Sequence, residues 1–261
     1  NTAVNLLTLG LSGRYDLRGA TWLISGIAGV NHNVAPLAAL LWAGWVVDGD
    51  LAFEFDPREM PGAWETGVIP LGAREPYGPV PAGASELFGE SYQVFRLDPG
   101  LAERAHAATR GLELADTDEL AEARAPYAHD CPEALAAPFV GRGDVLSAAR
   151  FWHGRLPNRW AERWVDYWTH GRGHFASASM EDTGSLLALR RLDALGLADF
   201  SRVAVLRTGS NFTRPPAGVE PAGNILGHGD SEATYPGYLP ALENGARAGC
   251  AFLDEIVYAK T

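Results

Sequence analysis

The sequence predicts an α/β sandwich with a mixed, partly parallel central sheet. Short apolar runs typical of buried strands alternate along the chain with longer segments of helical pattern. With 261 residues, 47% of them hydrophobic, the chain can bury a large core. The length suits one α/β domain or two small ones, and we expect residues 1–261 to form a single domain; the chain shows no internal repeat.

The first two elements are an apolar helix and a buried strand. Residues 1–11, NTAVNLLTLGL, have the composition of an apolar helix. Residues 20–30, ATWLISGIAGV, form a short apolar run that contains Gly26 and Gly29 near its end. This pattern predicts a buried strand that leads into a glycine-rich turn.

The next segment predicts a helix, a strand and a loop. Residues 35–47, APLAALLWAGWVV, are apolar throughout, and Pro36 suits the first turn of a helix. In residues 50–56 large apolar side chains alternate with small or acidic ones, which predicts a half-buried strand. Residues 57–83 are rich in proline and glycine and predict a long loop.

The middle of the chain changes from helical to strand-like. Residues 101–127 have a helical pattern that is interrupted at Gly111 and stopped by Pro126. Residues 138–154, PFVGRGDVLSAARFWHG, are strand-like and then irregular. We therefore expect helices followed by a strand in this region.

A tryptophan stripe follows. Trp160, Trp164 and Trp168 lie four residues apart and therefore share one helix face. A packed or oligomer-facing stripe is favoured over a sugar-binding platform. His170 and His174 have the spacing of a helical metal pair, but the two glycines near them break the helix, so we expect no metal site.

The last elements are two helices with a strand between them. The stretch ASASMEDTGSLLALRRL, residues 176–192, carries acidic residues just before a helical run. Residues 203–207 predict a buried strand that ends in a polar turn, and residues 240–260 predict a closing helix.

Three patches lie at predicted strand ends, where α/β sheets bind their ligands. Each also has a purely structural interpretation as a turn or a helix cap. The glycine patch lacks the third glycine of a dinucleotide-binding fingerprint. The patches are Gly26 to Gly29, Met180 with Glu181, and Ser210 with Asn211.

The composition excludes several classes of partner. A net charge of −11 and a pI near 5.1 disfavour nucleic acid and anionic membrane surfaces, because phosphate binding requires clustered basic residues. Lys260 is the only lysine, which excludes a lysine Schiff base and a P-loop lysine within this chain. Cys131 and Cys250 lack metal-ligand spacing and fit one disulfide or two thiols. The longest apolar run, residues 34–47, is shorter than the roughly 20 residues of a membrane span.

Five long segments occur in the order found in one protein family. The chain resembles the purine nucleoside permease (NUP) family, which is similar in fold to the nucleoside phosphorylases, over roughly residues 1–257. The resemblance implies a nucleoside phosphorylase-like α/β/α sandwich. The segments are LISGIAGVN, LAFEFDPREMPGAWETGVIPLG, GDVLSAARFWHG, WTHGRGHFASASMEDTGSLLAL and VLRTGSNFTRPP.

The resemblance implies a ribose site at Met180 and Glu181. In nucleoside phosphorylases and related nucleosidases a Met-Glu pair holds the sugar, and the carboxylate accepts hydrogen bonds from its 2′ and 3′ hydroxyls. A carboxylate can accept two such donors, and charge-assisted hydrogen bonds are strong. A negative charge beside the sugar also favours the oxocarbenium-like state in which the glycosidic bond breaks.

The resemblance also implies a base site. Asn211 matches the place of an Asp or Asn that contacts the purine in relatives, and as an amide it can only donate a hydrogen bond to the departing base. Ser210 and Phe212 would flank the base, and Phe151 or Trp152 would stack on it. His153 is expected either at the sugar or as a buried, hydrogen-bonded histidine.

The nucleophile is left open between phosphate and water. Many phosphorylases carry Ser or Thr where this chain has Ile27, and the isoleucine cannot hydrogen-bond to an anion. The backbone N–H groups of Gly26, Ala28 and Gly29 would then have to bind the anion. Arg58 and Arg207 are alternative phosphate ligands, or structural ion-pair partners. Inorganic phosphate is thus a possible co-substrate, and no other cofactor is expected.

Three functions follow from the resemblance. We expect cleavage of the N-glycosidic bond of a purine nucleoside, with Glu181 and Asn211 as catalytic residues; the alternatives are a nucleoside-binding role in uptake and a related pocket without this chemistry. Relatives assemble, so we expect a homo-oligomer, for which the tryptophan stripe is a candidate interface. Family members also carry further strands ahead of the first helix, so we expect residues upstream of Asn1, which leaves the compartment open.

Overall fold

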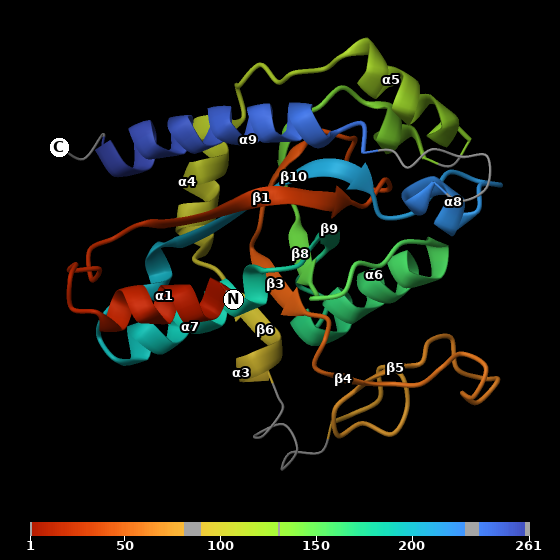
Figure 1. Cartoon of the computed structure of the whole chain (residues 1–261), viewed down its shortest axis with the longest axis horizontal. Coiled ribbons are helices and arrows are strands. Elements are labelled where there is room, and N and C mark those ends of the chain that lie inside the picture. Colours follow the sequence, from red (N-terminus) through yellow and green to blue (C-terminus); the bar gives the residue numbers. More distant parts are fainter. Residues whose placement is uncertain (1, 81–89, 130, 228–234, 259–261) are drawn as a thin grey trace.

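The computed structural model describes residues 2–80, 90–129, 131–227 and 235–258, and a mixed sheet of eight strands lies at their centre (Figure 1). β1 runs parallel to β10, and β8 runs parallel to both β3 and β9, whereas the β1–β9 and β10–β2 pairs are antiparallel. In sheet order the strands are β6 (Val94–Arg96), β3 (Trp45–Asp48), β8 (Asp144–Ser147), β9 (Phe175–Ser179), β1 (Trp22–Val30), β10 (Val203–Phe212), β2 (Leu40–Trp42) and β7 (Val140–Arg142).

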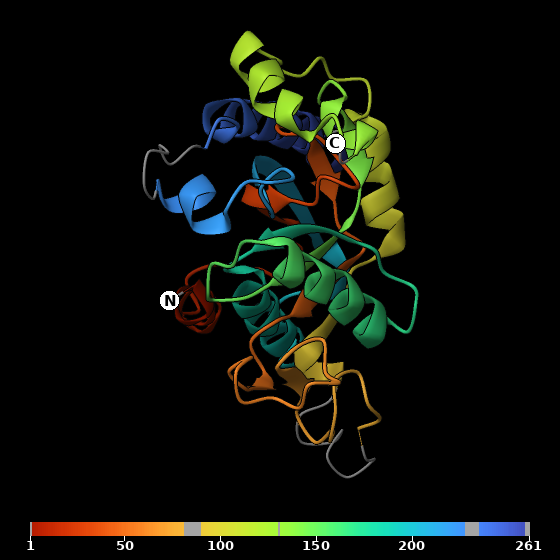
Figure 2. The same cartoon turned by 90° about the vertical axis from the view of Figure 1, so that its right-hand side faces the viewer.

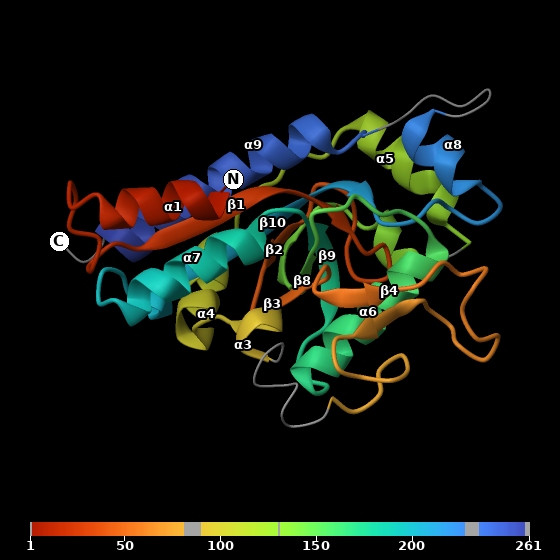
Figure 3. The ribbon, with the colours of Figure 1, turned by 60° about the horizontal axis from the view of Figure 1, so that its bottom comes forward.

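Helices cover both faces of this sheet, which confirms the predicted α/β sandwich. In Figures 1 and 3, α9 lies on one side of β1 and β10, and α7 lies on the other side with α1 packed against it. The helices are α1 (Thr2–Leu11), α3 (Glu90–Gln93), α4 (Pro99–Thr109), α5 (Asp118–Arg124), α6 (Arg155–Thr169), α7 (Asp182–Ala194), α8 (Pro221–Leu226) and α9 (Tyr238–Phe252), followed by a π-helical turn (Leu253–Tyr258).

On each face of the sheet, a separate apolar cluster packs the helices against the strands. On one face, Trp42 of β2 stacks on Phe252 of α9 with ring centroids 5.4 Å apart. On the other, Leu186 and Leu189 of α7 pack on the sheet residue Val205. Each fully buried side chain of this size stabilises the fold by about 1.5–3 kcal/mol, so both layers are firmly held.

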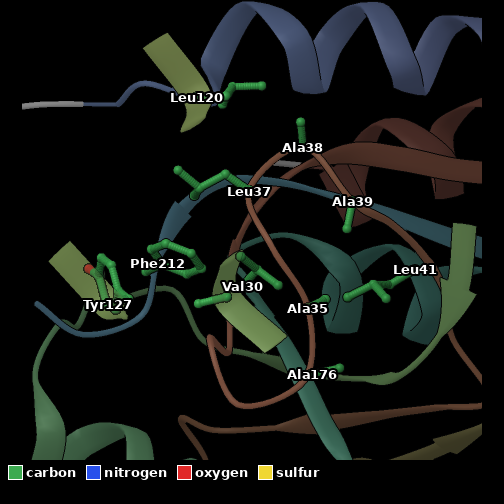
Figure 4. Close-up of a cluster of buried hydrophobic side chains, with 11 residues drawn as sticks. Val30, Ala35, Leu37, Ala38, Ala39, Leu41, Leu120, Tyr127, Ala176 and Phe212 are labelled. Carbon is green, nitrogen blue, oxygen red and sulfur yellow. The ribbon is translucent and has the colours of Figure 1, made fainter. Parts of the chain in front are cut away.

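A further cluster closes the end of the sheet where β1 and β10 finish (Figure 4). Val30 and Phe212 are the last residues of the two strands, and Leu37 packs beside them. The ring of Tyr127 lies 4.3 Å from that of Phe212, and its hydroxyl donates to the carbonyl oxygen of Arg214 at 2.8 Å.

The helix predicted for residues 35–47 is wrong. This segment forms the short strands β2 and β3, joined through Gly44. Most of its side chains are buried, as Leu40 and Val46 illustrate, so the run is apolar on every side. Such a run has no period that distinguishes a buried strand from a buried helix, and the β-sheet partners decided the outcome.

Two predicted turns are also wrong, because they belong to strands. Gly26 and Gly29 lie inside β1, and Ser210 and Asn211 lie inside β10, which extends to Phe212. Polar side chains are unusual in a central strand. Their burial here is possible because each forms hydrogen bonds, described below.

Several other elements agree with the sequence. The helix predicted at residues 1–11 is α1, the tryptophan-rich segment is α6, and the closing helix contains α9, although the predicted end of that helix at residues 259–260 lies outside the described residues. The pattern at residues 101–127 divides into α4, α5 and a 3-10 turn. Gly111 lies in the break between the two helices, where it avoids the cost of glycine in a helix interior.

A two-stranded ribbon stands apart from the main sheet, beyond α6 (Figure 2). It consists of β4 (Ala52–Glu54) and β5 (Val68–Pro70). The predicted strand is therefore present but short, and Phe53 and Phe55, on its apolar side, still keep nearly half of their surface in solvent. The predicted loop contains β5, and its residues 81–83 lie outside the described residues.

Candidate functional site

The three polar patches meet across neighbouring strands. In the parallel β1–β10 pair, Gly26 is opposite Arg207 and Gly29 is opposite Asn211. On the other side of β1, Gly29 is opposite Ala178 of β9, whose chain continues directly to Met180 and the start of α7. Adjacent strands lie about 5 Å apart, so this topology brings all three patches within the span of one small ligand.

A cavity of about 530 Å³ opens at this place. Its rim is aromatic and exposed: Phe151, Tyr235 and Tyr238 each keep about half of their surface in solvent. This volume and mixed lining are typical of small-molecule sites. The lining residues are Gly26, Ile27, Ala28, Gly29, Arg150, Phe151, Trp152, Ala178, Ser179, Met180, Glu181, Ser210, Asn211, Thr213, Tyr235, Tyr238 and Leu242.

Glu181 is the acidic side chain of this cavity. It is the N-cap residue of α7, but its side chain forms no capping hydrogen bond. Its Oε1 lies 2.6 Å from Nη1 of Arg207, and its Oε2 accepts a 3.3 Å hydrogen bond from the backbone N–H of Met180. The side chain is 45% exposed, so it still offers acceptor capacity to the cavity.

Arg207 is buried beneath Glu181 and is held by a second carboxylate. Its Nε donates to Oδ2 of Asp182 at 2.9 Å, and its Nη2 pairs with Oδ1 of the same residue. Ser179 donates to Asp182 Oδ2 at 2.7 Å. Neither Arg207 nor Asp182 has any exposed side-chain surface, so this bidentate pair is isolated from water.

Burial and charge oppose each other in this pair. Burial raises the pKa of the Asp182 carboxyl, and the adjacent Arg207 works against that rise. Burial also disfavours the charged Arg207, but Asp182 and Glu181 outweigh it and hold the pKa of the guanidinium above its usual value. The cation is therefore permanent, and it fixes one oxygen of Glu181.

The glycine at position 26 makes room for this ion pair. A Cβ atom at Gly26 would lie 2.6 Å from Nη1 of Arg207 and 3.3 Å from Oε1 of Glu181. The first distance is well inside van der Waals contact, and Arg207 is fully buried and held by two carboxylates, so a shift would disturb both ion pairs. The absence of a side chain at this position is thus a packing requirement of the site.

Asn211 lies in the wall where β10 passes the cavity, and it is buried. Its Oδ1 accepts from the hydroxyl of Ser210 at 2.9 Å, and its Nδ2 donates to the carbonyl oxygen of Phe212 at 3.1 Å. The Ser210 hydroxyl also contacts the carbonyl oxygen of Ala28 at 3.2 Å. Nδ2 has a second hydrogen, so the amide can still donate to a ligand.

The structure brings the expected binding residues together around this cavity except for two. Phe212 points to the cluster with Tyr127 and does not line the cavity. His153 also lies off the lining: its Nε2 donates to Oδ1 of Asn224 at 2.9 Å, and burial lowers the pKa of its ring. Its position fits the second expectation for His153, a buried and hydrogen-bonded histidine. The binding roles of the other residues stay predictions.

For the two arginines, the structure shows the expected alternative of structural ion pairs. Arg58 lies in the segment that joins β4 to β5, pairs with Asp56 at 2.7 Å and is absent from the cavity lining. Arg207 lies beside the cavity but already serves both acidic neighbours. The tryptophan stripe is not an exposed interface, since Trp164 is fully buried and donates through Nε1 to the carbonyl oxygen of Asp48 at 2.7 Å. Both cysteines are free thiols.

Sequence reasoning missed several residues of the site. Asp182 follows Glu181 directly at the start of a predicted helix, where an acidic residue is typical of a helix cap, and its partner is 25 positions away. Tyr235 and Tyr238 precede and open α9, and no local pattern links them to a cavity. Arg150 pairs with Glu54 of the ribbon, another long-range contact.

Over the described ranges, no group of three or more His, Cys, Asp or Glu residues is arranged to hold a metal ion. In the same part of the chain, no helix has both the length and the apolar character of a membrane span.

The comparisons with known proteins cover nearly the whole chain. The chain is 30% identical over 265 residues to a probable purine nucleoside permease of Schizosaccharomyces pombe, in an alignment that covers 98% of this chain and 72% of that protein. It is 26% identical to a purine nucleoside permease of Candida albicans, with 98% of this chain and 61% of that protein covered.

One solved structure shows the same fold. The chain is similar to the futalosine hydrolase of Helicobacter pylori, with a TM-score of 0.50, 13% identity and coverage of 97% of this chain and 74% of the other. The family model described as purine nucleoside permease (NUP) matches residues 1–260. On this match, the chain belongs to the purine nucleoside permease (NUP) family.

Proposed function

We propose that this protein binds a purine nucleoside in the cavity at β1, β9 and β10 and cleaves its N-glycosidic bond. The observation that carries the proposal is the position of Glu181 and Asn211 on the walls of one cavity with an aromatic rim. A sugar requires an acceptor for its hydroxyls, and a purine requires an aromatic surface and a polar group at its edge. The cavity offers each of these.

Glu181 supports the sugar half of the proposal. Arg207 holds Oε1, so the carboxylate is fixed in one orientation and Oε2 is available to the ribose hydroxyls. An oriented carboxylate costs little reorganisation when positive charge develops on the sugar ring, which favours bond breaking over simple binding.

Asn211 supports the leaving-group half. Its Oδ1 and one hydrogen of Nδ2 are fixed by Ser210 and Phe212, so the remaining hydrogen has a defined direction. An amide is not an acid at physiological pH, and Asn211 would stabilise the departing base by a hydrogen bond only. Phe151 and Tyr235 on the rim offer stacking surfaces for the base.

A second function is a nucleoside-binding role in uptake without catalysis. The names of the two fungal relatives favour it, because both are described as purine nucleoside permeases. Binding alone would use the aromatic rim and Glu181. It would not require a group that stabilises the leaving base.

The test is to incubate the full-length protein with adenosine, guanosine and inosine and to follow free base by chromatography. We expect base release, and we expect Glu181→Ala to reduce turnover or nucleoside affinity at least tenfold, as for a charged hydrogen-bond partner of about 1.5–3 kcal/mol. Glu59→Gln removes an exposed carboxylate of the ribbon segment and is the matched control. Nucleoside binding without base release would favour the uptake role, and an unchanged Glu181→Ala variant would refute the ribose site.

A further inference from the structure

We infer that Asp182 withholds Arg207 from the second substrate: by occupying the guanidinium, it favours water over orthophosphate as the nucleophile. The inference rests on the proposed function and extends it to the second substrate. It depends on how the donors around Glu181 are already used.

All three nitrogens of the Arg207 guanidinium donate to protein acceptors. Nε and Nη2 bind the two oxygens of Asp182, and Nη1 binds Oε1 of Glu181 and contacts the carbonyl oxygen of Ile27 at 3.4 Å. The guanidinium has no exposed surface. A bidentate phosphate would have to displace Asp182 from a position with no solvent to receive it.

The charges around the guanidinium also disfavour phosphate. Asp182 and Glu181 together present two acidic groups against one cation. An entering phosphate would bring further negative charge close to Glu181, and like charges repel. A water molecule carries no charge and therefore enters beside Glu181 without this repulsion.

The backbone of residues 26–29 does not form an anion-binding site in place of Arg207. Residues 26–29 are part of β1, whose pairing with β10 shifts register between Ala28 and Gly29. Neither Gly26 nor Gly29 has the positive φ that several other glycines of the described chain adopt. The backbone therefore lacks the left-handed residue with which successive N–H groups form an anion-binding nest. The side chain of Ile27 adds no hydroxyl.

The other polar side chains of the wall are engaged as well. The hydroxyls of Ser179, Ser210 and Thr213 each donate to a protein oxygen, the last to Asn158 at 2.5 Å. Of the described lining residues, Arg150 is the only one with a basic side chain, and it pairs with Glu54.

The reaction that follows is hydrolysis. The oxygen of water forms a bond to C1′ of the sugar while the C1′–N bond breaks and its electron pair leaves with the purine. One water proton ends on the base nitrogen and the other stays on the new anomeric hydroxyl, so the products are free base and free sugar. Glu181 accepts a hydrogen bond from the attacking water in this scheme.

The experiment compares the full-length protein with Asp182→Asn, in which the acidic partner of Arg207 becomes neutral at constant shape. Base release and the sugar product are measured with and without orthophosphate, and phosphate binding is measured by calorimetry. We expect the unaltered protein to release free sugar at a rate that phosphate does not raise. Asp182→Asn should bind phosphate at least tenfold more tightly, whereas Asp118→Asn, an exposed carboxylate on α5, should not.

Each other outcome has a distinct meaning. Base release that depends on phosphate, with a sugar 1-phosphate as product, overturns the inference and leaves the proposed function standing. If no base is released, the proposed function fails, and phosphate binding then decides the inference: equal affinity for phosphate in the unaltered protein and in Asp182→Asn overturns it. If Asp182→Asn does not fold by circular dichroism, the phosphate dependence of the unaltered protein decides alone.

Discussion

Arg207 Nη1 lies 2.6 Å from Glu181 Oε1, and this contact joins the central strand β10 to the N-cap residue of α7. It couples the stability of the sheet to the orientation of the cavity's acidic group. Burying a cation with two acidic partners costs free energy, because all three groups lose their hydration. Removing one member of the network costs more, because it leaves a buried charge without a partner.

The first prediction concerns this network. Arg207→Met should lower the free energy of unfolding by about 3–5 kcal/mol, because it leaves Asp182 buried without its cation. Adding Asp182→Asn should recover part of that loss, since contacting residues are energetically coupled. Urea unfolding followed by tryptophan fluorescence measures both. Arg58→Met removes an exposed ion pair and should leave stability nearly unchanged; strict additivity of the two buried substitutions would contradict the network.

The second prediction concerns the glycine at position 26. Gly26→Ala places a Cβ atom 2.6 Å from Nη1 of Arg207, so the ion pair must shift. Overpacking of this kind costs about 1–3 kcal/mol, and we expect at least a tenfold loss of nucleoside binding or turnover through the displaced Glu181. Gly19→Ala is the matched control, because nothing lies within 4 Å of its Cβ position. Equal activity of the two variants would show that Glu181 does not depend on this packing.

The third prediction is a pH dependence of stability. Burial lowers the pKa of His153 from the usual 6.5, so just below pH 6.5 the unfolded chain binds a proton that the folded protein does not. The contribution of His153 to the free energy of unfolding is therefore complete above pH 6.5. It is lost as the pH falls below that value, at up to about 1.4 kcal/mol per pH unit. Between pH 7.5 and pH 5.5 the free energy of unfolding should fall less in His153→Gln than in the unaltered protein, as measured by chemical denaturation. Replacing the exposed His129 by Gln should keep the original slope; an unchanged slope in His153→Gln would be evidence against this assignment.

The fourth prediction concerns the tryptophan face of α6. Trp164→Ala removes a fully buried ring and its hydrogen bond to Asp48, and it should cost about 3–5 kcal/mol. Because this face packs inside the chain, the oligomeric state of the folded variant should not change. Chemical denaturation and light scattering after size exclusion test the two statements. A change of oligomeric state without loss of stability would restore the face as an interface.

The sequence by itself determined the elements whose pattern has a clear period. The tryptophan spacing predicts α6, and the apolar runs predict the starts of β1 and β10, because side chains repeat with helix or strand geometry regardless of their partners. The resemblance to the NUP family and the presence of acidic and amide residues near predicted strand ends were also available at this level.

Tertiary structure decided the remaining features. Residues 40–48 are apolar on all sides, so only the sheet partners of β2 and β3 distinguish them from a helix. Gly26 serves packing and not a turn, because the side chain of Arg207 on the neighbouring strand requires its space. Asp182 binds a residue 25 positions away. Interactions of this kind depend on strand register, which brings distant residues together and leaves no signal in the local sequence.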